Sequence, residues 1–185
     1  MMNHDPVSQH SLAEEIFLIG FECTRCGECC IEREKGSHIV MVSPDEIQAI
    51  MKITGMSWEE IAEPFPDSTE IDGKEVTFEW AIRRNNSECF FLKERQCMIY
   101  DARPWICRTY PFMAEDKKLV MPSVCKGIGM SISEKEAFFL AGVLLDRVEA
   151  EHLEEERITS HLHYLSSSIG KRILIDGEGI KNIHG

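Results

Sequence analysis

Four cysteines stand within eight residues of the sequence, in the run C-T-R-C-G-E-C-C that ends at Cys30. Thiolates two residues apart can turn toward one soft metal centre, because a tight turn brings both side chains together while its backbone N–H groups point at the sulfurs. Gly27 suits such a turn. Zinc knuckles use one such pair per half-site, whereas the succession of Cys23, Cys26 and Cys29 is typical of the leading ligands of a ferredoxin-type cluster.

Further ligands must come from elsewhere, because the Cys-Pro that supplies the fourth ligand in the ferredoxin pattern is missing. Four more cysteines lie downstream, so the chain has enough thiolates for two sites with four thiolate ligands each. The candidate cofactor- and metal-binding residues are therefore Cys23, Cys26, Cys29, Cys30, Cys89, Cys97, Cys107 and Cys125. Adjacent residues of an extended chain point to opposite sides, so we expect Cys29 and Cys30 to face different sites, or only one of them to bind metal.

The identity of the metal stays open at this point. Tetrahedral four-sulfur coordination suits both iron and zinc, although the C-x2-C-x2-C run favours an iron–sulfur cluster, of which [4Fe–4S] is one form. Two other uses of a cysteine are weighed against metal binding. Cys107, beside Arg108, is the best candidate for a reactive nucleophile, and for Cys125 taken alone the alternative to metal binding is a small buried hydrophobe. No catalytic residue can be assigned.

Charge around the downstream cysteines favours a thiolate site. Between Arg83 and Lys126 there are nine basic and five acidic residues, a local balance of 9 − 5 = +4 in a chain of net charge −12. Guanidinium groups can compensate coordinated thiolates and donate hydrogen bonds to sulfur, and we expect Arg103 and Arg108 to do so. The overall negative charge disfavours non-specific binding to nucleic acid.

The length of 185 residues predicts one domain with an extension. The first apolar stretch, 16–21, follows two glutamates and does not read as a signal peptide, and the longest apolar run, 137–145, is about half of the ~20 residues that span a bilayer. We therefore expect a cytoplasmic protein without a membrane span. In the reducing cytosol, many cysteines indicate metal or redox chemistry more often than disulfides.

Three capping boxes, each a serine followed three residues later by a glutamate, predict where helices begin. The pairs are Ser43 with Glu46, Ser57 with Glu60, and Ser133 with Glu136. The predicted helices cover about 44–53, ended by Gly55, then 57–62, and a long one from 133 to about 165. Its acidic middle, 146–156, is either a solvated face or a docking surface for a basic protein partner.

Strands are expected where apolar residues alternate or cluster. Over 76–82 the residues Val76, Phe78, Trp80 and Ile82 fall on one face, and 38–42 has strand composition. Segments 89–92 and 97–100 predict a tight hairpin that brings their cysteines together. The remaining expectations are a helical turn within 104–111, a short strand at 118–121, a loose terminus over 1–15, and a tail after Gly170 without periodicity.

The cysteine pattern resembles the CxxCxxCC family of cysteine-cluster proteins. The resemblance is carried by C-T-R-C-G-E-C-C, C-F-F-L, C-M-I-Y-D-A-R-P-W-I-C-R-T-Y-P-F and a last cysteine, and it covers about residues 21–130. It implies a zinc- or iron-chelating domain, and members are often labelled iron–sulfur oxidoreductases. Similar clusters occur in flagellin lysine N-methylases, which implies a methyl-transfer context.

Together these observations predict an α+β protein with an extension over 1–20, a cysteine-rich metal-binding domain over 21–130, and a long C-terminal helix and tail over 131–185. We expect it to hold one or more iron–sulfur clusters for electron transfer or redox sensing. If the protein is an enzyme, the expected class is an iron–sulfur oxidoreductase. The alternatives are a zinc-stapled structural or interaction module and an accessory of a protein methyltransferase.

Overall fold

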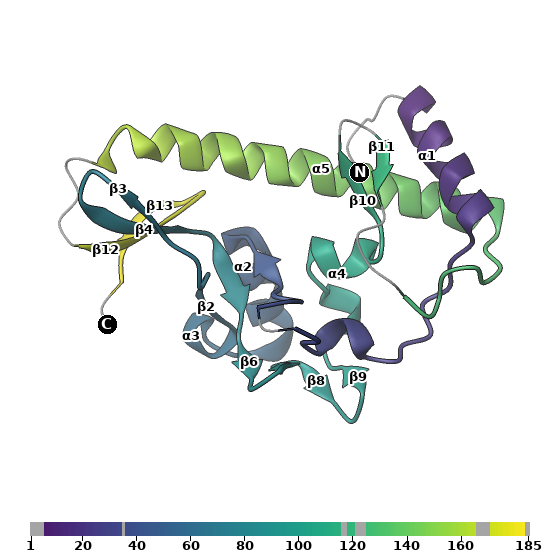
Figure 1. Cartoon of the computed structure of the whole chain (residues 1–185), viewed down its shortest axis with the longest axis horizontal. Coiled ribbons are helices and arrows are strands. Elements are labelled where there is room, and N and C mark those ends of the chain that lie inside the picture. The colour runs from purple at the N-terminus through teal and green to yellow at the C-terminus, as the bar shows by residue number, and fades with distance from the viewer. Residues whose placement is uncertain (1–5, 35, 116–117, 121–124, 166–170, 184–185) are drawn as a thin grey trace.

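One long helix, α5 (Glu134–Leu162), runs along one side of the molecule and has a different packing partner at each end (Figure 1). Helix α1 (Pro6–Ile19) lies against its first half, and strand β12 (Arg172–Asp176) lies under its last turns. The shorter helices α2 (Pro44–Thr54), α3 (Trp58–Ile61) and α4 (Trp105–Thr109) lie below α5 in this view. The structure, a computed structural model, describes residues 6–34, 36–115, 118–120, 125–165 and 171–183.

The strands are short and form five small sheets, so the predicted α+β class is confirmed. The remaining strands are β1 (Met41–Val42), β2 (Ala62–Pro64), β3 (Thr69–Ile71), β4 (Lys74–Phe78), β5 (Trp80–Ile82), β6 (Arg84–Asn85), β7 (Glu88–Cys89), β8 (Leu92–Lys93), β9 (Gln96–Cys97), β10 (Met113–Glu115), β11 (Lys118–Val120) and β13 (Gly179–Asn182). One sheet has the order β13-β12-β4-β3 and another β1-β5-β2, while β6-β7, β8-β9 and β10-β11 are two-stranded.

All three predicted helix starts are confirmed, because each capping box has both of its reciprocal hydrogen bonds. Helix α2 ends at Gly55, whose φ of 71° is the left-handed conformation that glycine adopts without strain. Helix α5 ends at Leu162, three residues before the predicted limit. The predicted turn around Pro104 is α4, and the strand predicted at 118–121 is β11, with residue 121 outside the described residues.

The prediction of a loose N-terminus is wrong for residues 6–15. They form most of α1, and the side chains of Leu12 and Ile16 are fully buried against α5, where they pack with Leu144 and Phe112. The four-residue spacing of the two buried side chains places them on one helix face, so tertiary packing stabilises a helix without an N-cap signal.

The strand predicted over 76–82 is in fact two strands that belong to different sheets. The chain turns at Glu79, which has a φ of 69°, so β4 pairs with β3 and β12 while β5 pairs with β1 and β2. Val76 is therefore buried in one hydrophobic cluster and Ile82 in another. Period-two alternation continues across the turn by coincidence, and for that reason it does not reveal the break. The strand predicted over 38–42 is shorter, comprising only β1.

The tail after Gly170 also has more structure than the sequence indicated. Strands β12 and β13 form a hairpin across residues 177 and 178, and β12 pairs in parallel with β4 from Arg172–Glu75 to Ile175–Phe78. The fully buried Ile173 packs with Val76 and with Ile158 of α5. A parallel partner about a hundred residues away leaves no local signal, although the apolar run before Asp176 is typical of a buried strand.

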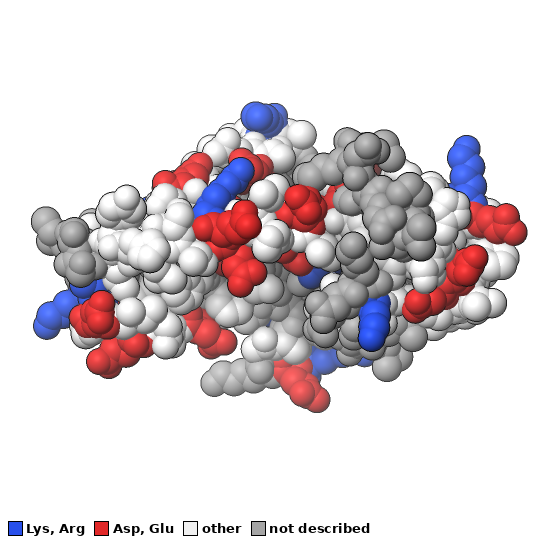
Figure 2. Space-filling view, turned by 90° about the horizontal axis from the view of Figure 1, so that it is seen from above, with Lys and Arg blue, Asp and Glu red and all other residues white. Residues whose placement is uncertain are grey.

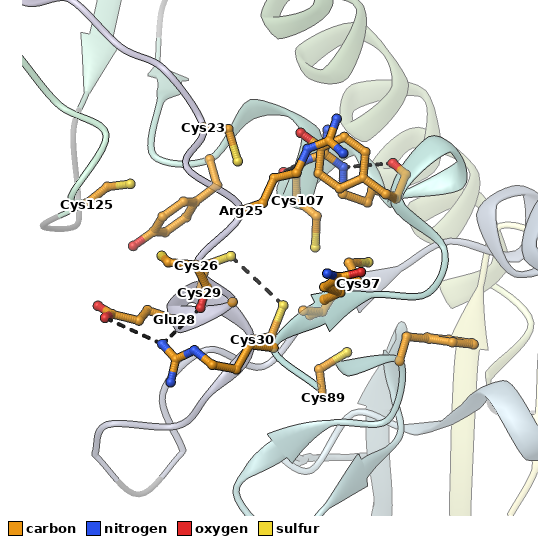
Figure 3. A pocket seen from close by; sticks show the side chains of 18 of the residues that line it. Cys23, Arg25, Cys26, Glu28, Cys29, Cys30, Cys89, Cys97, Cys107 and Cys125 are labelled. Carbon is orange, nitrogen blue, oxygen red and sulfur yellow. Dashed lines mark hydrogen bonds and ion pairs between the residues drawn. The ribbon is translucent and has the colours of Figure 1, made fainter. Parts of the chain in front are cut away.

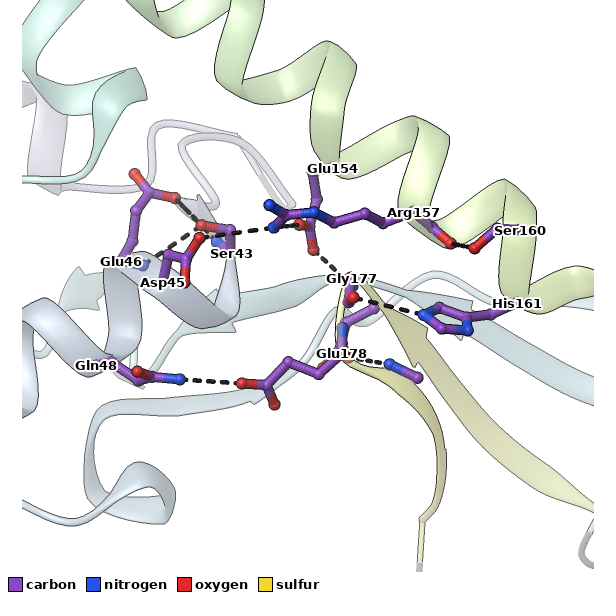
Figure 4. A network of polar contacts seen from close by, with 12 residues as sticks. Ser43, Asp45, Glu46, Gln48, Glu154, Arg157, Ser160, His161, Gly177 and Glu178 are labelled. Carbon is purple, nitrogen blue, oxygen red and sulfur yellow. Dashed lines mark hydrogen bonds and ion pairs between the residues drawn. The ribbon is translucent and has the colours of Figure 1, made fainter. Parts of the chain in front are cut away.

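A polar network joins α2, α5 and the β12–β13 turn (Figure 4). The Arg157 guanidinium of α5 lies 3.6 Å from the Asp45 carboxylate and 3.7 Å from that of Glu154. Glu154 in turn accepts a 2.7 Å hydrogen bond from the Gly177 backbone N–H. The long helix is thus fixed to the cysteine-bearing part of the chain near the start of α2.

Acidic side chains are spread along the face seen from the α5 side (Figure 2). On α5 the exposed acidic residues include Glu149, Glu151, Glu155 and Glu156. Among the helices that the structure describes, none combines the length and the apolar character needed to cross a membrane.

Candidate metal centre

All eight cysteines line one cavity of about 380 Å³ below α4 (Figure 3). They come from five parts of the chain, and each of them is a free thiol. The structure therefore brings together the whole set of ligands predicted from the sequence. The site-forming segments are mostly loops and two-residue strands, so their positions depend on a few backbone contacts.

Cys125 is held near the first cysteine group, residues 23–30, by backbone pairing between the segment before Cys23 and the segment after Cys125. Phe21 and Ile128 form an antiparallel bridge, and the Glu22 N–H donates to the Gly127 carbonyl over 3.0 Å. A Cβ at position 127 would lie 2.1 Å from the Glu22 oxygen, so only glycine permits this approach.

Cys89 is brought to the other side of the first group by a second bridge, between Ile31 and Glu88. The hairpin predicted between 89–92 and 97–100 exists as β8–β9, but Cys89 lies outside its strands. Cys97 pairs with Leu92 across β8–β9, while Cys89 pairs with Arg84 across β6–β7. Two consecutive hairpins therefore deliver the two thiols, because each strand is only two residues long.

The β8–β9 turn touches the first cysteine group at Gly27. Gly27 has a left-handed backbone with a φ of 74°, and a Cβ at this position would lie 2.9 Å from the Arg95 carbonyl oxygen. The Arg95 guanidinium also donates a 3.0 Å hydrogen bond to the Cys26 carbonyl. This close approach holds Cys97 beside the C-T-R-C-G-E-C-C run.

We expect Gly27→Ala to destabilise the metal-loaded protein by about 2 kcal/mol or more, because an L-residue pays about 1–2 kcal/mol in this conformation before any clash is counted. Gly55→Ala is the matched control, since Gly55 has a φ of 71° and nothing within 4 Å of its added Cβ. Urea denaturation of both variants measures the difference. Equal losses would show that the Arg95 contact contributes nothing.

Cys29 and Cys30 lie on a turn of 3-10 helix, η1 (Glu28–Cys30), and their sulfurs are 4.0 Å apart. The expectation that the two side chains point to opposite sides is therefore wrong, because it assumed an extended backbone. The hydrogen bond from Cys30 lowers the pKa of Cys29 to about 7, and Arg103 also favours its thiolate. The same bond raises the pKa of Cys30.

Four of the other thiols that line the cavity have a raised pKa and therefore resist ionisation. Burial raises the pKa of Cys107, and the neighbouring thiols Cys89, Cys29 and Cys97 raise it further. Burial is also the main cause of the raised pKa of Cys89, of Cys97 and of Cys125. A cation placed among these sulfurs lowers the pKa of the thiols, because it favours the thiolate form. It therefore opposes the effects of burial and of the neighbouring thiols.

The thiols fall into two neighbourhoods that share Cys29 (Figure 3). In the inner one, the pKa of Cys30 is raised by Cys29, by burial, and by Cys89 and Cys107. In the outer one, burial raises the pKa of Cys125, the Gly127 N–H lowers it, and the neighbouring thiols Cys26, Cys23 and Cys29 raise it further. The inner neighbourhood is Cys30, Cys89, Cys97 and Cys107, and the outer one is Cys23, Cys26 and Cys125.

Of the two arginines predicted beside the site, Arg103 lines the cavity and Arg108 does not. Arg103 donates to the Tyr100 carbonyl over 2.9 Å and lies over the Tyr100 ring, 3.7 Å from its centroid. Arg108 instead lies over the Trp105 ring, 5.0 Å from its centroid, and donates to the Arg103 carbonyl. Arg103 lies at the end of the 3-10 turn over 100–102 and Arg108 lies on α4, so the two side chains leave the chain from different elements.

Several charged residues at the cavity were missed by the sequence analysis. Arg25 stacks on the same Tyr100 ring at 4.2 Å. Glu28 pairs with Arg33 at 2.9 Å and also with Lys126, whose hydrogen bond lowers the pKa of the Glu28 carboxyl. The positions of Arg25 and Glu28 within the cysteine run were the available signal.

The donor set fits an inorganic centre, because thiolates are the ligands that zinc, copper(I) and iron–sulfur clusters prefer. The sulfurs surround the cavity rather than meeting at one point. Within the described ranges, no three side chains of His, Cys, Asp or Glu converge closely enough to hold a single ion.

Comparison with known proteins agrees with this donor set. No solved structure matches the chain. A family model described as "CxxCxxCC: Putative zinc- or iron-chelating domain" matches residues 22–126, more than half of the sequence. This range contains all eight cysteines and the bridge between Ile31 and Glu88, and the bridge between Phe21 and Ile128 lies just outside its two ends. The chain therefore belongs to the CxxCxxCC family, whose cysteine-rich domain is a metal-chelating one.

Proposed function

We propose that the protein holds one or more iron–sulfur clusters through its cysteine thiolates and works in electron transfer or redox sensing. The observation that carries the proposal is the single cavity lined by all eight thiols. Its volume of about 380 Å³ has room for more than one ion. The C-x2-C-x2-C spacing of its first three cysteines supports a cluster over a mononuclear site.

We further propose that the two neighbourhoods are two four-thiolate sites, with Cys29 completing the outer one. The inner site is then Cys30, Cys89, Cys97 and Cys107, and the outer one Cys23, Cys26, Cys29 and Cys125. Bound iron and sulfide would supply one-electron chemistry. The protein's own part is to hold the sulfurs, to limit access of water, and to offset thiolate charge with Arg25 and Arg103.

Separate replacements test this division. We expect Cys29→Ser and Cys30→Ser each to remove about half of the bound metal, but from different sites, so the metal that remains should have a different spectrum in each variant. The measurement is the metal content per chain together with the visible absorbance of each anaerobically purified variant. Identical losses and identical residual spectra would contradict the division into two sites.

Zinc binding is the second candidate, in which the domain is a structural or interaction module. It is favoured by the 4.0 Å distance between the Cys29 and Cys30 sulfurs. Two ligands of a tetrahedral zinc with bonds of about 2.3 Å lie about 3.8 Å apart, so this pair needs little movement to share an ion. In this case the site stabilises the fold and carries no electron.

Elemental analysis decides between the two. Iron and acid-labile sulfide in parity, with an electron paramagnetic resonance signal that changes on reduction, would support clusters. Zinc at one or two ions per chain without sulfide would support the module. The protein should be purified anaerobically, because exposed clusters are oxidised in air. The proposal includes a cytoplasmic location, where thiols stay reduced and available to metal.

A further inference from the structure

Helix α4, which carries Cys107, is five residues long and has too few internal hydrogen bonds to hold its own position. Both of its ends are tied to longer helices. At the first end, the Trp105 N–H donates a 2.7 Å hydrogen bond to Glu46 of α2. The other oxygen of Glu46 closes the α2 capping box with Ser43, so one carboxylate serves the starts of two helices (Figure 4).

The second end of α4 is tied to α5 through a buried polar pair. The Arg147 guanidinium donates a 2.8 Å hydrogen bond to the Thr109 hydroxyl. That hydroxyl donates in turn to the Trp105 carbonyl over 3.0 Å, one turn back along α4. Thr109 is fully buried and Arg147 is only 5% exposed.

A buried guanidinium is costly for the fold. Desolvating the charge costs several kcal/mol, and an apolar side chain of similar volume often stabilises a protein as much or more. Arg147 has one ion-pair partner, Glu151, at 2.7 Å, and this carboxylate is about half exposed. Leu144, three residues before Arg147 on α5, belongs to a buried apolar cluster with Phe112. Stability alone therefore gives no reason for an arginine here.

We propose that Arg147, acting through Thr109, is a positioning residue that fixes the Cys107 thiol in the cavity wall. Cys107 lies midway between Trp105, whose backbone N–H donates to Glu46, and Thr109, whose hydroxyl accepts from Arg147. Arg147 lies outside the segment that contains the cysteines. The long helix is therefore part of the support of the metal centre. This inference rests on the proposed function.

The test uses the full chain, stripped of metal and reduced, and titrated with Co²⁺ as the probe under anaerobic conditions. Thiolate-bound cobalt absorbs in the visible and near ultraviolet, so one titration reports both the affinity and the geometry of the sulfurs. Thr109→Val removes the hydroxyl at nearly constant volume. Thr109→Ser keeps it. Loss of a residue that orients a ligand costs about ten- to a hundredfold in metal affinity.

We expect Thr109→Val and Arg147→Met to weaken Co²⁺ binding by about ten- to a hundredfold and to shift the thiolate bands, and Thr109→Ser to restore both. Ile16→Ala is the matched control, because it removes buried volume at the cluster of α1 and α5 that includes Leu12 and Leu144, outside residues 21–130. It should lower thermal stability and leave the affinity within about twofold of the wild type, well below the loss expected for a ligand-orienting residue.

Two results would overturn the inference. One is wild-type affinity and spectrum in Thr109→Val or in Arg147→Met. The other is a loss that Ile16→Ala reproduces, which would mean that general destabilisation explains it. Arg147→Lys keeps the charge and tests the role if Arg147→Met fails to fold. A wild-type chain without thiolate–cobalt bands would instead overturn the proposed function itself.

Discussion

Removal of the metal is expected to abolish cooperative unfolding of residues 21–130. Apparent binding energies of structural zinc are about 10–16 kcal/mol, which equals or exceeds the roughly 5–15 kcal/mol of total stability in a typical domain. The segments that carry the thiols are turns and two-residue strands. Apart from Phe91 and Ile99, which pack into the cluster around Ile47 and Ile50, they bury few side chains, so the thiol-bearing turns depend on a shared inorganic centre for their order.

The measurement is a thermal scan by circular dichroism before and after treatment with a chelator and a reductant, with hydrogen exchange at residues 84–100. Exchange in α1 and the first half of α5 is the internal control, because Leu12, Ile16 and Leu144 form a separate apolar cluster there. Adding the metal back should restore the transition. A chelator-treated protein that keeps a sharp transition at the same temperature would contradict the prediction.

Metal affinity is expected to rise steeply with pH. A thiol with a raised pKa is protonated in the metal-free protein at neutral pH, and it must release its proton to bind. The pKa is raised at Cys30, Cys89, Cys97, Cys107 and Cys125. Each such thiol changes the dissociation constant tenfold per pH unit, so a site with four of them changes it by roughly 10⁴ per unit.

The sign of this effect is fixed by the direction of the shifts. Because the thiols stay protonated up to pH values above their ordinary range, affinity keeps rising through neutrality and falls as the solution is acidified. Competition against a chelator between about pH 6 and 8, corrected for the chelator's own protonation, measures the slope. Calorimetry in buffers of different ionisation enthalpy counts the protons released. Cys125→Ser should reduce the slope by one proton, and a wild-type slope below one proton per metal would refute the assignment.

The sequence alone identified the thiol set and the helices that carry strong local signals. Ser43 with Glu46 and Ser133 with Glu136 predicted the starts of α2 and α5, because a capping box is formed by residues three positions apart. The eight cysteines could likewise be found by residue type and spacing. Both kinds of signal are local and chemical.

What the sequence did not reveal depends on contacts between distant residues. Leu12 and Ile16 are buried only because α5 lies beside them, and β12 exists as a strand because β4 is its parallel neighbour. The turn at Glu79 places one alternating pattern in two sheets. At the cavity, Arg103 and Arg108 belong to different elements, and no spacing rule predicts which of the two faces the thiols.

The bridge between Phe21 and Ile128 places the two ends of the family segment, 22–126, side by side. A unit whose entry and exit points adjoin can be inserted into a surface loop of a host protein without separating the flanking strands of that host. The segment also buries Phe112 against α1 and α5 and Val76 against α5 and β12, so a transplanted segment keeps its core only if those elements accompany it.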